Sequence, residues 1–288
     1  MTGVEPTWTL QSETGVLTEV LMCPPDHYRW LDTNAVAHGT LGAGRPFDKA
    51  AAAAQFAGLV EVLRREGVRP RFLDPQPHLP YQVYTRDSSQ TTPWGPLLTQ
   101  LRMPQRRGEY AAVIDFHGPG FWKYASAGTC EGGDIHIIRP GLLLVGYSGV
   151  RTDLDGARQL AGWFEALGWR VRLQPFAEHF LHLDVLFCMA TDDLAVCCPQ
   201  ALGADFAAWL AAEGIAVIEA SYAEVMAMSC NLLALGGSRV ISPTHSVRIN
   251  TELRERGVTV FDPPLDIFAA GGGSVHCMTM PLQRERLP

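Results

Sequence analysis

The 288-residue sequence lacks features that define several large classes of protein. No apolar run approaches the ~20 residues that a membrane-spanning helix needs. No run is rich in Lys or Arg, and the formal net charge of −7 has the wrong sign for a nucleic-acid surface. Neither a G-x-G-x-x-G nor a P-loop pattern is present, so no nucleotide cofactor is predicted. We therefore expect neither nucleic acid nor a membrane as a partner.

The cysteines lack the spacing of a metal site or a disulfide framework. There are seven, an odd number, with no C-x-x-C pair and no His-x3-His pattern beside them. Residues 1–10 also lack the basic-then-apolar order of a signal peptide. We therefore predict reduced thiols, no metal and a cytoplasmic location.

The sequence does contain a repeat. Four times a predicted helix ends in glycine and a strand follows at once, at Gly67, Gly168, Gly214 and Gly257. The interval between Gly67 and Gly168 is about twice the interval between the later glycines, and a weaker unit around residue 110 would fill it. The pattern predicts five strand–strand–helix–strand modules, which indicates a radial architecture rather than an open sheet. Because no domain boundary interrupts the modules, residues 1–288 are predicted to form a single catalytic domain.

The C-terminal stretch Gly271–Pro281 reads Gly-Gly-Gly-Ser-Val-His-Cys-Met-Thr-Met-Pro. Three consecutive glycines allow tight bends or a close approach to a ligand. They lead into a predicted strand that carries Cys277, a residue type that is nucleophilic once ionised. In a strand, His276 would face away from the side that Cys277 uses, so it is left out of the predicted site. The alternative is that Cys277 only fills the core.

Three polar clusters stand where other predicted strands begin or end. They are Thr85-Arg86-Asp87, Glu131-Gly132-Gly133-Asp134 and His182-Leu183-Asp184. If residues 182–184 form a strand, His182 and Asp184 share one face, because side chains in a strand alternate with period two. Each cluster has a structural alternative: a surface ion pair, a turn or a capping pair. Together with Cys277 they favour one catalytic site.

These residue types suit attack on a guanidinium group. Carboxylates such as Asp87 and Asp184 can bind the N–H donors of a planar cation. A thiolate can add to the central carbon, and a histidine can protonate the departing amine and later activate water. Glu131 would hold that imidazole in its charged form. Since a free thiol has a pKa of ~8.5, either the site or the cationic substrate must lower the pKa of the cysteine.

Four motifs in this order resemble those of the guanidino-group modifying enzymes with the pentein fold. These enzymes include dimethylarginine dimethylaminohydrolases, arginine deiminases, agmatine deiminases and amidinotransferases. The motifs are Tyr-Thr-Arg-Asp-Ser (84–88), Glu-Gly-Gly-Asp (131–134), His-Leu-Asp (182–184) and the glycine–cysteine stretch (271–281). The resemblance spans essentially the whole chain. It implies an α/β fold, the pentein α/β propeller, with five ββαβ modules in pseudo-fivefold arrangement around a central active site.

The resemblance also implies roles for particular residues. Cys277 would be the nucleophile, His182 the general acid and base, and Glu131 its partner. Candidate substrate-binding residues are the acids and arginines of the same motifs and of two further stretches, 101–109 and 146–152, that resemble the dimethylaminohydrolases: Asp87, Asp184, Asp134, Arg86, Arg102 and Arg151. Arg102 and Arg151 would bind the α-carboxylate of the substrate; the alternative is that both are solvated surface residues.

Two positions depart from particular subgroups. Several dimethylaminohydrolases have lysine where Asp184 stands, and a second carboxylate leaves less room for methyl groups on the guanidinium. Deiminases place an arginine just before the glycines, where this chain has Ala269 and Ala270. Plain arginine, an N-substituted arginine and another guanidino compound therefore all remain open as substrates.

The sequence thus predicts a cysteine-dependent hydrolase that attacks the guanidinium carbon of arginine or an N-substituted arginine. It would pass through a covalent thiouronium intermediate and release a ureido product, such as citrulline, with an amine or ammonia. The alternatives are an amidinotransferase, a deiminase of another guanidino compound, and a non-catalytic pentein module such as the translation initiation factor with this fold. No cofactor is expected. The predicted partner is the small guanidino substrate, and a homodimer is left open.

Overall fold

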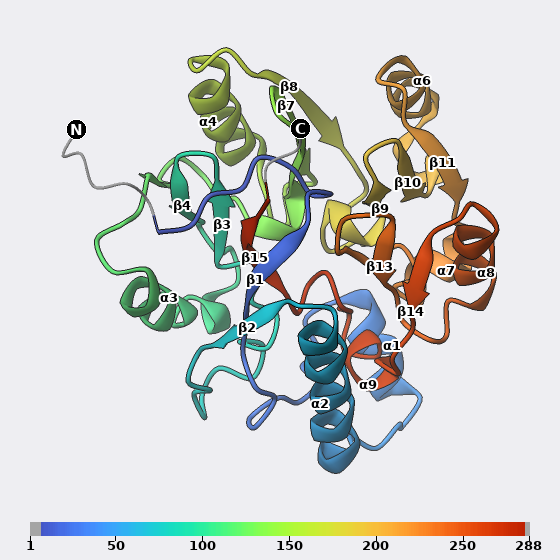
Figure 1. Cartoon of the computed structure of the whole chain (residues 1–288). Coiled ribbons are helices and arrows are strands. Elements are labelled where there is room, and N and C mark those ends of the chain that lie inside the picture. The colour runs from blue at the N-terminus through green and yellow to red at the C-terminus, as the bar shows by residue number, and fades with distance from the viewer. Residues whose placement is uncertain (1–6, 286–288) are drawn as a thin grey trace.

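The computed structural model describes residues 7–285, which form five three-stranded sheets around a common axis, with the larger helices on the outside (Figure 1). The strands, sheet by sheet, are β15 (Met280–Arg284), β1 (Leu17–Met22) and β2 (Arg69–Phe72); β3 (Ser89–Thr92), β4 (Gly95–Leu98) and β5 (Lys123–Tyr124); β6 (Ile135–Arg139), β7 (Leu142–Tyr147) and β8 (Arg170–Pro175); β9 (Phe187–Thr191), β10 (Leu194–Cys197) and β11 (Ala216–Glu219); β12 (Leu233–Ala234), β13 (Arg239–Ile241) and β14 (Thr259–Phe261).

Helices connect the middle and outer strand of each sheet. The α-helices are α1 (Ala35–Gly42), α2 (Lys49–Arg65), α3 (Glu109–His117), α4 (Leu154–Glu165), α5 (Pro199–Leu202), α6 (Ala204–Ala212), α7 (Tyr222–Met226), α8 (Val247–Glu255) and α9 (Asp266–Ala269). Three short 3₁₀ turns lie at Pro104–Arg106, Gly132–Asp134 and Leu183–Val185. The side chain of Asp48 caps the first turn of α2, and Asp153 does the same for α4.

The same connectivity recurs in all five sheets. The first two strands are antiparallel, and the third runs parallel to the middle strand after a helical crossover. Gly67, Gly168, Gly214 and Gly257, which follow the crossover helices, all have φ between +75° and +82°. Glycine reaches this left-handed region without the penalty that a Cβ brings. The prediction of five modules is therefore confirmed.

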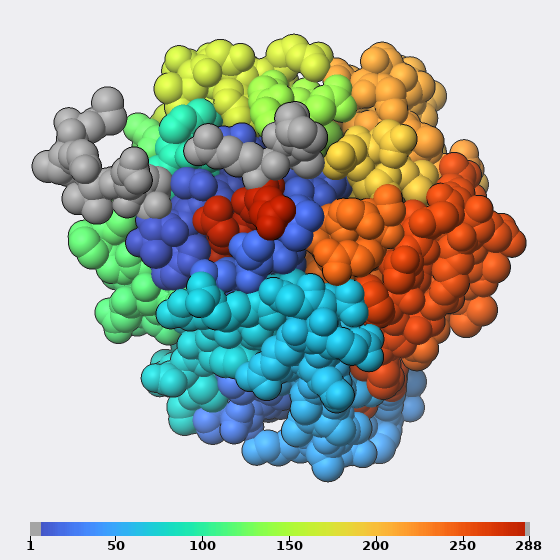
Figure 2. Space-filling model, in the orientation of Figure 1, coloured from blue at the N-terminus to red at the C-terminus, as the bar shows by residue number. Residues whose placement is uncertain are grey.

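The ring closes through the two ends of the chain. Strand β15 pairs antiparallel with β1, and Leu21 lies opposite Met280. Figure 2 shows the result on one face, where residues from the end of the chain lie among residues from its beginning. One sheet is thus completed only when the last strand is added.

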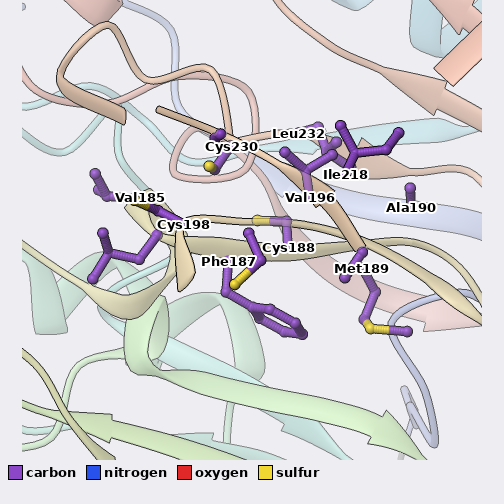
Figure 3. Close-up of a cluster of buried hydrophobic side chains, with 14 of the residues drawn as sticks. Val185, Phe187, Cys188, Met189, Ala190, Val196, Cys198, Ile218, Cys230 and Leu232 are labelled. Carbon is purple, nitrogen blue, oxygen red and sulfur yellow. The ribbon is translucent and has the colours of Figure 1, made fainter. Parts of the chain in front are cut away.

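The core lies mainly between neighbouring sheets and their helices. One large cluster fills the space around β9–β11 and reaches towards α8 (Figure 3). It contains four of the seven cysteines, Cys188, Cys197, Cys198 and Cys230, and all seven are buried free thiols. Burial raises the pKa of Cys188 and Cys230, which keeps these thiols protonated and unreactive at neutral pH.

Some local expectations were wrong. Residues 26–46 contain α1, a helix that the sequence pattern does not indicate and that Asn34 caps by accepting a hydrogen bond from the Ala37 backbone. The helix has glycines and a weak apolar pattern, so its periodicity gives no signal. Cys277 does not lie in a strand: residues 271–278 form turns, and β15 begins only at Met280. Residues 182–184 lie on a 3₁₀ turn instead of a strand.

Within residues 7–285, no helix is both long enough and apolar enough to cross a membrane. The signal-peptide prediction for residues 1–10 concerns a segment that lies mostly outside the described residues.

Two glycines of α4 should respond oppositely to alanine. A Cβ on Gly156 would lie 2.0 Å from the Thr129 carbonyl oxygen, whereas a Cβ on Gly162 would meet nothing within 4 Å. Gly156→Ala should therefore lower the free energy of unfolding by about 1–3 kcal/mol, because backbone must move. Gly162→Ala should raise it by up to about 1 kcal/mol, because alanine favours the helix. Urea denaturation measures both changes, and equal effects of the two substitutions would contradict the packing described here.

Candidate active site

Cys277 lies on a turn that is held from two sides. The Met278 backbone N–H donates to the Ser274 carbonyl at 3.0 Å, and the Arg86 backbone N–H donates to the Cys277 carbonyl at 3.1 Å. The side chain of Cys277 is 4% exposed, and its Sγ reaches one carboxylate oxygen, Asp184 Oδ2, at 3.3 Å. Burial, together with Asp184 and Asp87, raises the pKa of Cys277 well above that of a free cysteine. In this structure it is a thiol at neutral pH.

The three glycines make room for tyrosines beside the turn. A Cβ on Gly271 would lie 2.0 Å from the hydroxyl of Tyr28, and one on Gly273 would lie 2.5 Å from the ring of Tyr84. Gly272 has a φ of +96°. The hydroxyls of Tyr28 and Tyr84 are 2.6 Å apart. The glycines are therefore needed for close packing as well as for bending.

His182 is held between two acids. Its Nε2 lies 2.7 Å from Glu131 Oε2, and its Nδ1 lies 3.6 Å from Asp87 Oδ1. Burial alone would favour the neutral imidazole, but Asp87, Glu131 and Asp134 outweigh it and raise the pKa of His182 to about 10. Burial likewise opposes the charged form of Glu131, yet the hydrogen bond from His182 and the charge of Arg151 lower its pKa to about 2. The two residues form a buried ion pair at neutral pH.

The two glycines of the 131–134 motif explain how the pair packs. A Cβ on Gly133 would lie 2.8–2.9 Å from atoms of the His182 side chain, and one on Gly132 would lie 2.0 Å from the Arg86 carbonyl oxygen. Asp134 follows directly, but its Oδ1 accepts from the Leu183 backbone N–H at 2.7 Å. Asp134 therefore supports the turn that carries His182 and Asp184, and it does not line the cavity beside Cys277.

Asp184 is shared by two neighbours. Its Oδ2 is 2.8 Å from His276 Nδ1 and 3.3 Å from Cys277 Sγ. Burial would raise its pKa, but the bond to His276 and the nearby histidine charges lower it to about 2. Burial lowers the pKa of His276 to about 4, so this imidazole is neutral and carries its proton on Nδ1, towards Asp184. His276, which the sequence left out of the site, thus orients one of its acids.

The cavity beside Cys277 is small. Its volume is about 20 Å³, which is room for about one water molecule. Its lining residues come from six separate stretches of the chain: Asn34, Tyr81, Tyr84, Asp87, Arg106, Arg151, Leu181, His182, Gly271, Gly272 and Cys277. Of the predicted site residues, Cys277, His182, Asp87 and Arg151 line it, and Glu131 lies directly behind His182. A guanidine can bind there only after the lining residues move apart.

The arginines separate into three groups. Arg151 is buried, lines the cavity and lies 3.7 Å from Glu131 Oε2. Arg102 is exposed, and its backbone N–H, not its side chain, bonds Glu131. Arg86 points away: its Nε donates to the His276 carbonyl, and its side chain lines a different small cavity with Glu13 and Arg284.

Arg106 is the functional candidate that sequence reasoning missed. Its Nη1 lies 2.5 Å from Asp87 Oδ2, and its Nε and Nη2 bond Glu109 at 2.8 and 2.9 Å. A further Nη2 bond goes to the Tyr84 carbonyl. The Arg-x-x-Glu spacing on one helical turn was the available signal, because residues three apart are neighbours.

Two groups of acids and histidines in residues 7–285 bring possible metal ligands within 4.8 Å of one another. They are Asp87, Glu131 and His182, and separately Glu13, His136 and His276. In the first group His182 is protonated at neutral pH, as its pKa of about 10 requires. Beside the second lie the guanidinium groups of Arg86 and Arg284. Since cations oppose a metal ion at both places, we assign neither group as a metal site.

Comparison with known proteins matches the chain to a family. The family described as "N,N dimethylarginine dimethylhydrolase, eukaryotic" matches residues 34–284. The chain belongs to this family. Among its relatives is the uncharacterised protein YkgA of Bacillus subtilis, 32% identical over 277 residues, covering 95% of this chain and 94% of that protein. The arginine deiminase of Rhodococcus jostii is 29% identical over 287 residues, covering 86% of this chain and 69% of the deiminase.

A solved structure adds a third comparison. The complex of L-arginine with a cysteine-to-alanine variant of AgrE superposes with a TM-score of 0.81 at 25% identity. It covers 94% of this chain but only 40% of that chain. These relations place the protein in the guanidino-group modifying superfamily with the pentein fold. It is a hydrolase acting on C–N bonds in linear amidines.

Removal of His182 should change how stability depends on pH. Because the pKa of His182 in the folded state exceeds its ordinary value of 6.5, its charged form contributes stability that is fully present below pH 6.5 and is lost as pH rises through about 10. Between these limits the wild type should lose on the order of a few kcal/mol of unfolding free energy. In His182→Gln this loss should be smaller, as measured by urea denaturation at several pH values.

A matched control is His38→Gln, since His38 is an exposed histidine that also pairs with an acid, Asp32. Its pH dependence should run parallel to that of the wild type. Parallel curves for His182→Gln and the wild type would show that the pair is not charged in the folded protein.

Proposed function

We propose that the protein hydrolyses the guanidinium group of arginine or an N-substituted arginine through Cys277, and that residues 1–288 act as a single catalytic domain. The observation that carries this proposal is that a thiol, a protonated histidine and a carboxylate line one small cavity: Cys277, His182 and Asp87. The relatives support the substrate class, since one is an arginine deiminase and another structure holds L-arginine.

In the first half-reaction the substrate cation lies beside Asp184 and Asp87. Its positive charge offsets the two carboxylates that raise the pKa of Cys277, so it favours release of the thiol proton to solvent water. The thiolate then adds to the guanidinium carbon. His182, which is protonated in the free enzyme, gives its proton to the departing nitrogen. The C–N bond breaks, an amine or ammonia leaves, and a thiouronium bound to Cys277 remains.

In the second half-reaction His182, now neutral, removes a proton from water. The hydroxide adds to the thiouronium carbon, the C–S bond breaks, and the thiolate leaves. The proton of the added hydroxyl group passes to the sulfur, which leaves the carbonyl of the ureido product and the thiol of Cys277. The products are the ureido compound and the regenerated Cys277, while Glu131 stabilises the imidazolium each time it forms. Asp87 and Asp184 would contact the guanidinium, and Arg151 would bind a carboxylate of the substrate.

Asp134, Arg86 and Arg102 are weaker candidates for substrate binding than Asp87, Asp184 and Arg151. Asp134 and Arg86 are engaged away from the cavity, so we propose structural roles for them. Arg102 reaches the substrate only if its exposed side chain turns inward. The amidinotransferase alternative uses the same first half-reaction, with an amine in place of water. The two differ in product, and addition of amine acceptors during turnover separates them.

Cys277→Ser should abolish turnover, by at least about a thousandfold, while the fold is kept. The assay offers purified protein arginine, Nω-methylated arginines, agmatine and other guanidines, and mass spectrometry identifies the products. We expect a ureido product from at least one arginine derivative. Cys23→Ser, at another buried thiol, is the matched control and should retain activity. Activity retained in Cys277→Ser would refute the mechanism.

Arg151→Gln should raise KM for arginine about tenfold or more, because a charged hydrogen bond to the α-carboxylate is lost. Agmatine has the same guanidine without that carboxylate, so its KM, or its inhibition constant if it is not turned over, should change less. Arg102→Gln tests the exposed arginine in the same way and should have the smaller effect. Equal losses for arginine and agmatine in Arg151→Gln would exclude carboxylate binding by Arg151.

A further inference from the structure

Asn231 belongs to none of the sequence motifs, yet its side chain contacts both the sulfur and the backbone N–H of Cys277. It is fully buried, in the irregular segment between α7 and β12. Its Nδ2 lies 3.2 Å from Cys277 Sγ and 3.3 Å from the Asp184 carbonyl oxygen. Its Oδ1 accepts from the backbone N–H groups of Ser274 at 3.1 Å and Cys277 at 3.3 Å. One amide therefore joins the nucleophile, its turn and the segment of Asp184.

The orientation of this amide is fixed by its partners. Both backbone groups at Oδ1 are donors, so the atom that faces them must be the oxygen. The other atom is then the NH₂ group, which also faces a carbonyl, an obligate acceptor. Nδ2 therefore directs a hydrogen towards Cys277 Sγ.

The sulfur consequently has one acceptor and one donor beside it. As a thiol, Cys277 donates to Asp184 Oδ2. As a thiolate, it has no proton to donate, and Asp184 becomes a repulsive neighbour. Among residues 7–285, Asn231 supplies the side-chain hydrogen-bond donor to this sulfur, and the Ser274 backbone also lowers the pKa of Cys277. The contact with Asn231 strengthens when the sulfur becomes charged.

The backbone just before Asn231 has an unusual conformation. Met228, three residues earlier, has a φ of +64°, an unfavourable conformation for a residue with a Cβ. The Asn231 N–H donates to the Met228 carbonyl at 3.2 Å. The chain thus accepts local strain in the turn that places this amide against the nucleophile.

We propose that Asn231 stabilises the thiolate of Cys277 by donating a hydrogen bond from Nδ2, while Oδ1 holds the turn that carries the nucleophile. This role rests on the proposed function, in which Cys277 is the nucleophile. Asn231 does not line the substrate cavity, so it acts on the reacting sulfur and makes no contact with substrate.

The test measures the pH dependence of Cys277 alkylation by iodoacetamide, with mass spectrometry to separate this site from the other cysteines. In Asn231→Ala the pH–rate profile should shift to higher pH by about one unit, because a hydrogen bond to the charged sulfur is lost. With an active substrate, kcat should fall about tenfold while KM changes little. Asn250→Ala removes another buried asparagine, on α8, and should leave the profile in place.

A folded Asn231→Ala whose profile coincides with the wild type, or moves to lower pH, would overturn the proposal. If Asn231→Ala does not unfold cooperatively, Asn231→Asp replaces it, since the aspartate keeps an acceptor for the turn. Its profile should shift at least as far, and a coincident profile would again overturn the proposal. Alkylation needs no substrate, so a wild type without guanidino activity would defeat the proposed function while leaving this result readable.

Discussion

The pairing of β1 with β15 is the constraint on which the site depends. It brings the end of the chain beside the segment that contains Asp87. The Thr85 hydroxyl donates to the Leu21 carbonyl on β1 and lies within hydrogen-bonding distance of the Met278 carbonyl just before β15. The Arg86 backbone N–H in the same segment donates to the Cys277 carbonyl. Without this closure Cys277 and Asp87 would lie on unconnected parts of the ring, because they are 190 residues apart in sequence.

The buried charged groups of the interior are arranged in pairs. An isolated buried ion is strongly unfavourable, so each must have a partner. His182 pairs with Glu131, Arg106 pairs with both Glu109 and Asp87, and His276 donates to Asp184. Removal of one member leaves the other without compensation. The pair of Glu131, just before β6, and His182, just before β9, joins two neighbouring modules, and all of these partners determine the protonation states of the buried groups.

Much of the fold was predictable because it rests on local signals. Helix periodicity and the glycine after each crossover helix gave five modules, and the positive φ of Gly67 and its counterparts explains why those glycines are required. Cys277, His182 and Asp87 were identified by residue type, motif order and resemblance, and the structure brings them together around one cavity.

The other residues around the site could not be placed from the sequence, because their contacts are with residues that are distant in sequence. His276 was judged by strand alternation, which does not apply to a turn. Asp134 and Arg86 belong to the right motifs, but their side chains are used to hold backbone groups. Asn231 lies in no recognisable pattern, since its four partners come from segments about 45 residues away in either direction. A polar residue in an irregular stretch has many possible partners, and only the packed structure selects among them.

The formal charges near the cavity explain why a cation suits it. Arg106 pairs with Asp87 and Glu109, and Glu131 lies beside both His182 and Arg151. Asp184, by contrast, accepts a hydrogen bond from the neutral His276. Burial, together with Asp184 and Asp87, raises the pKa of Cys277, so this thiol stays protonated in the free protein. A guanidinium group beside these carboxylates would offset their effect on the sulfur, so that binding of a cation and ionisation of Cys277 favour each other.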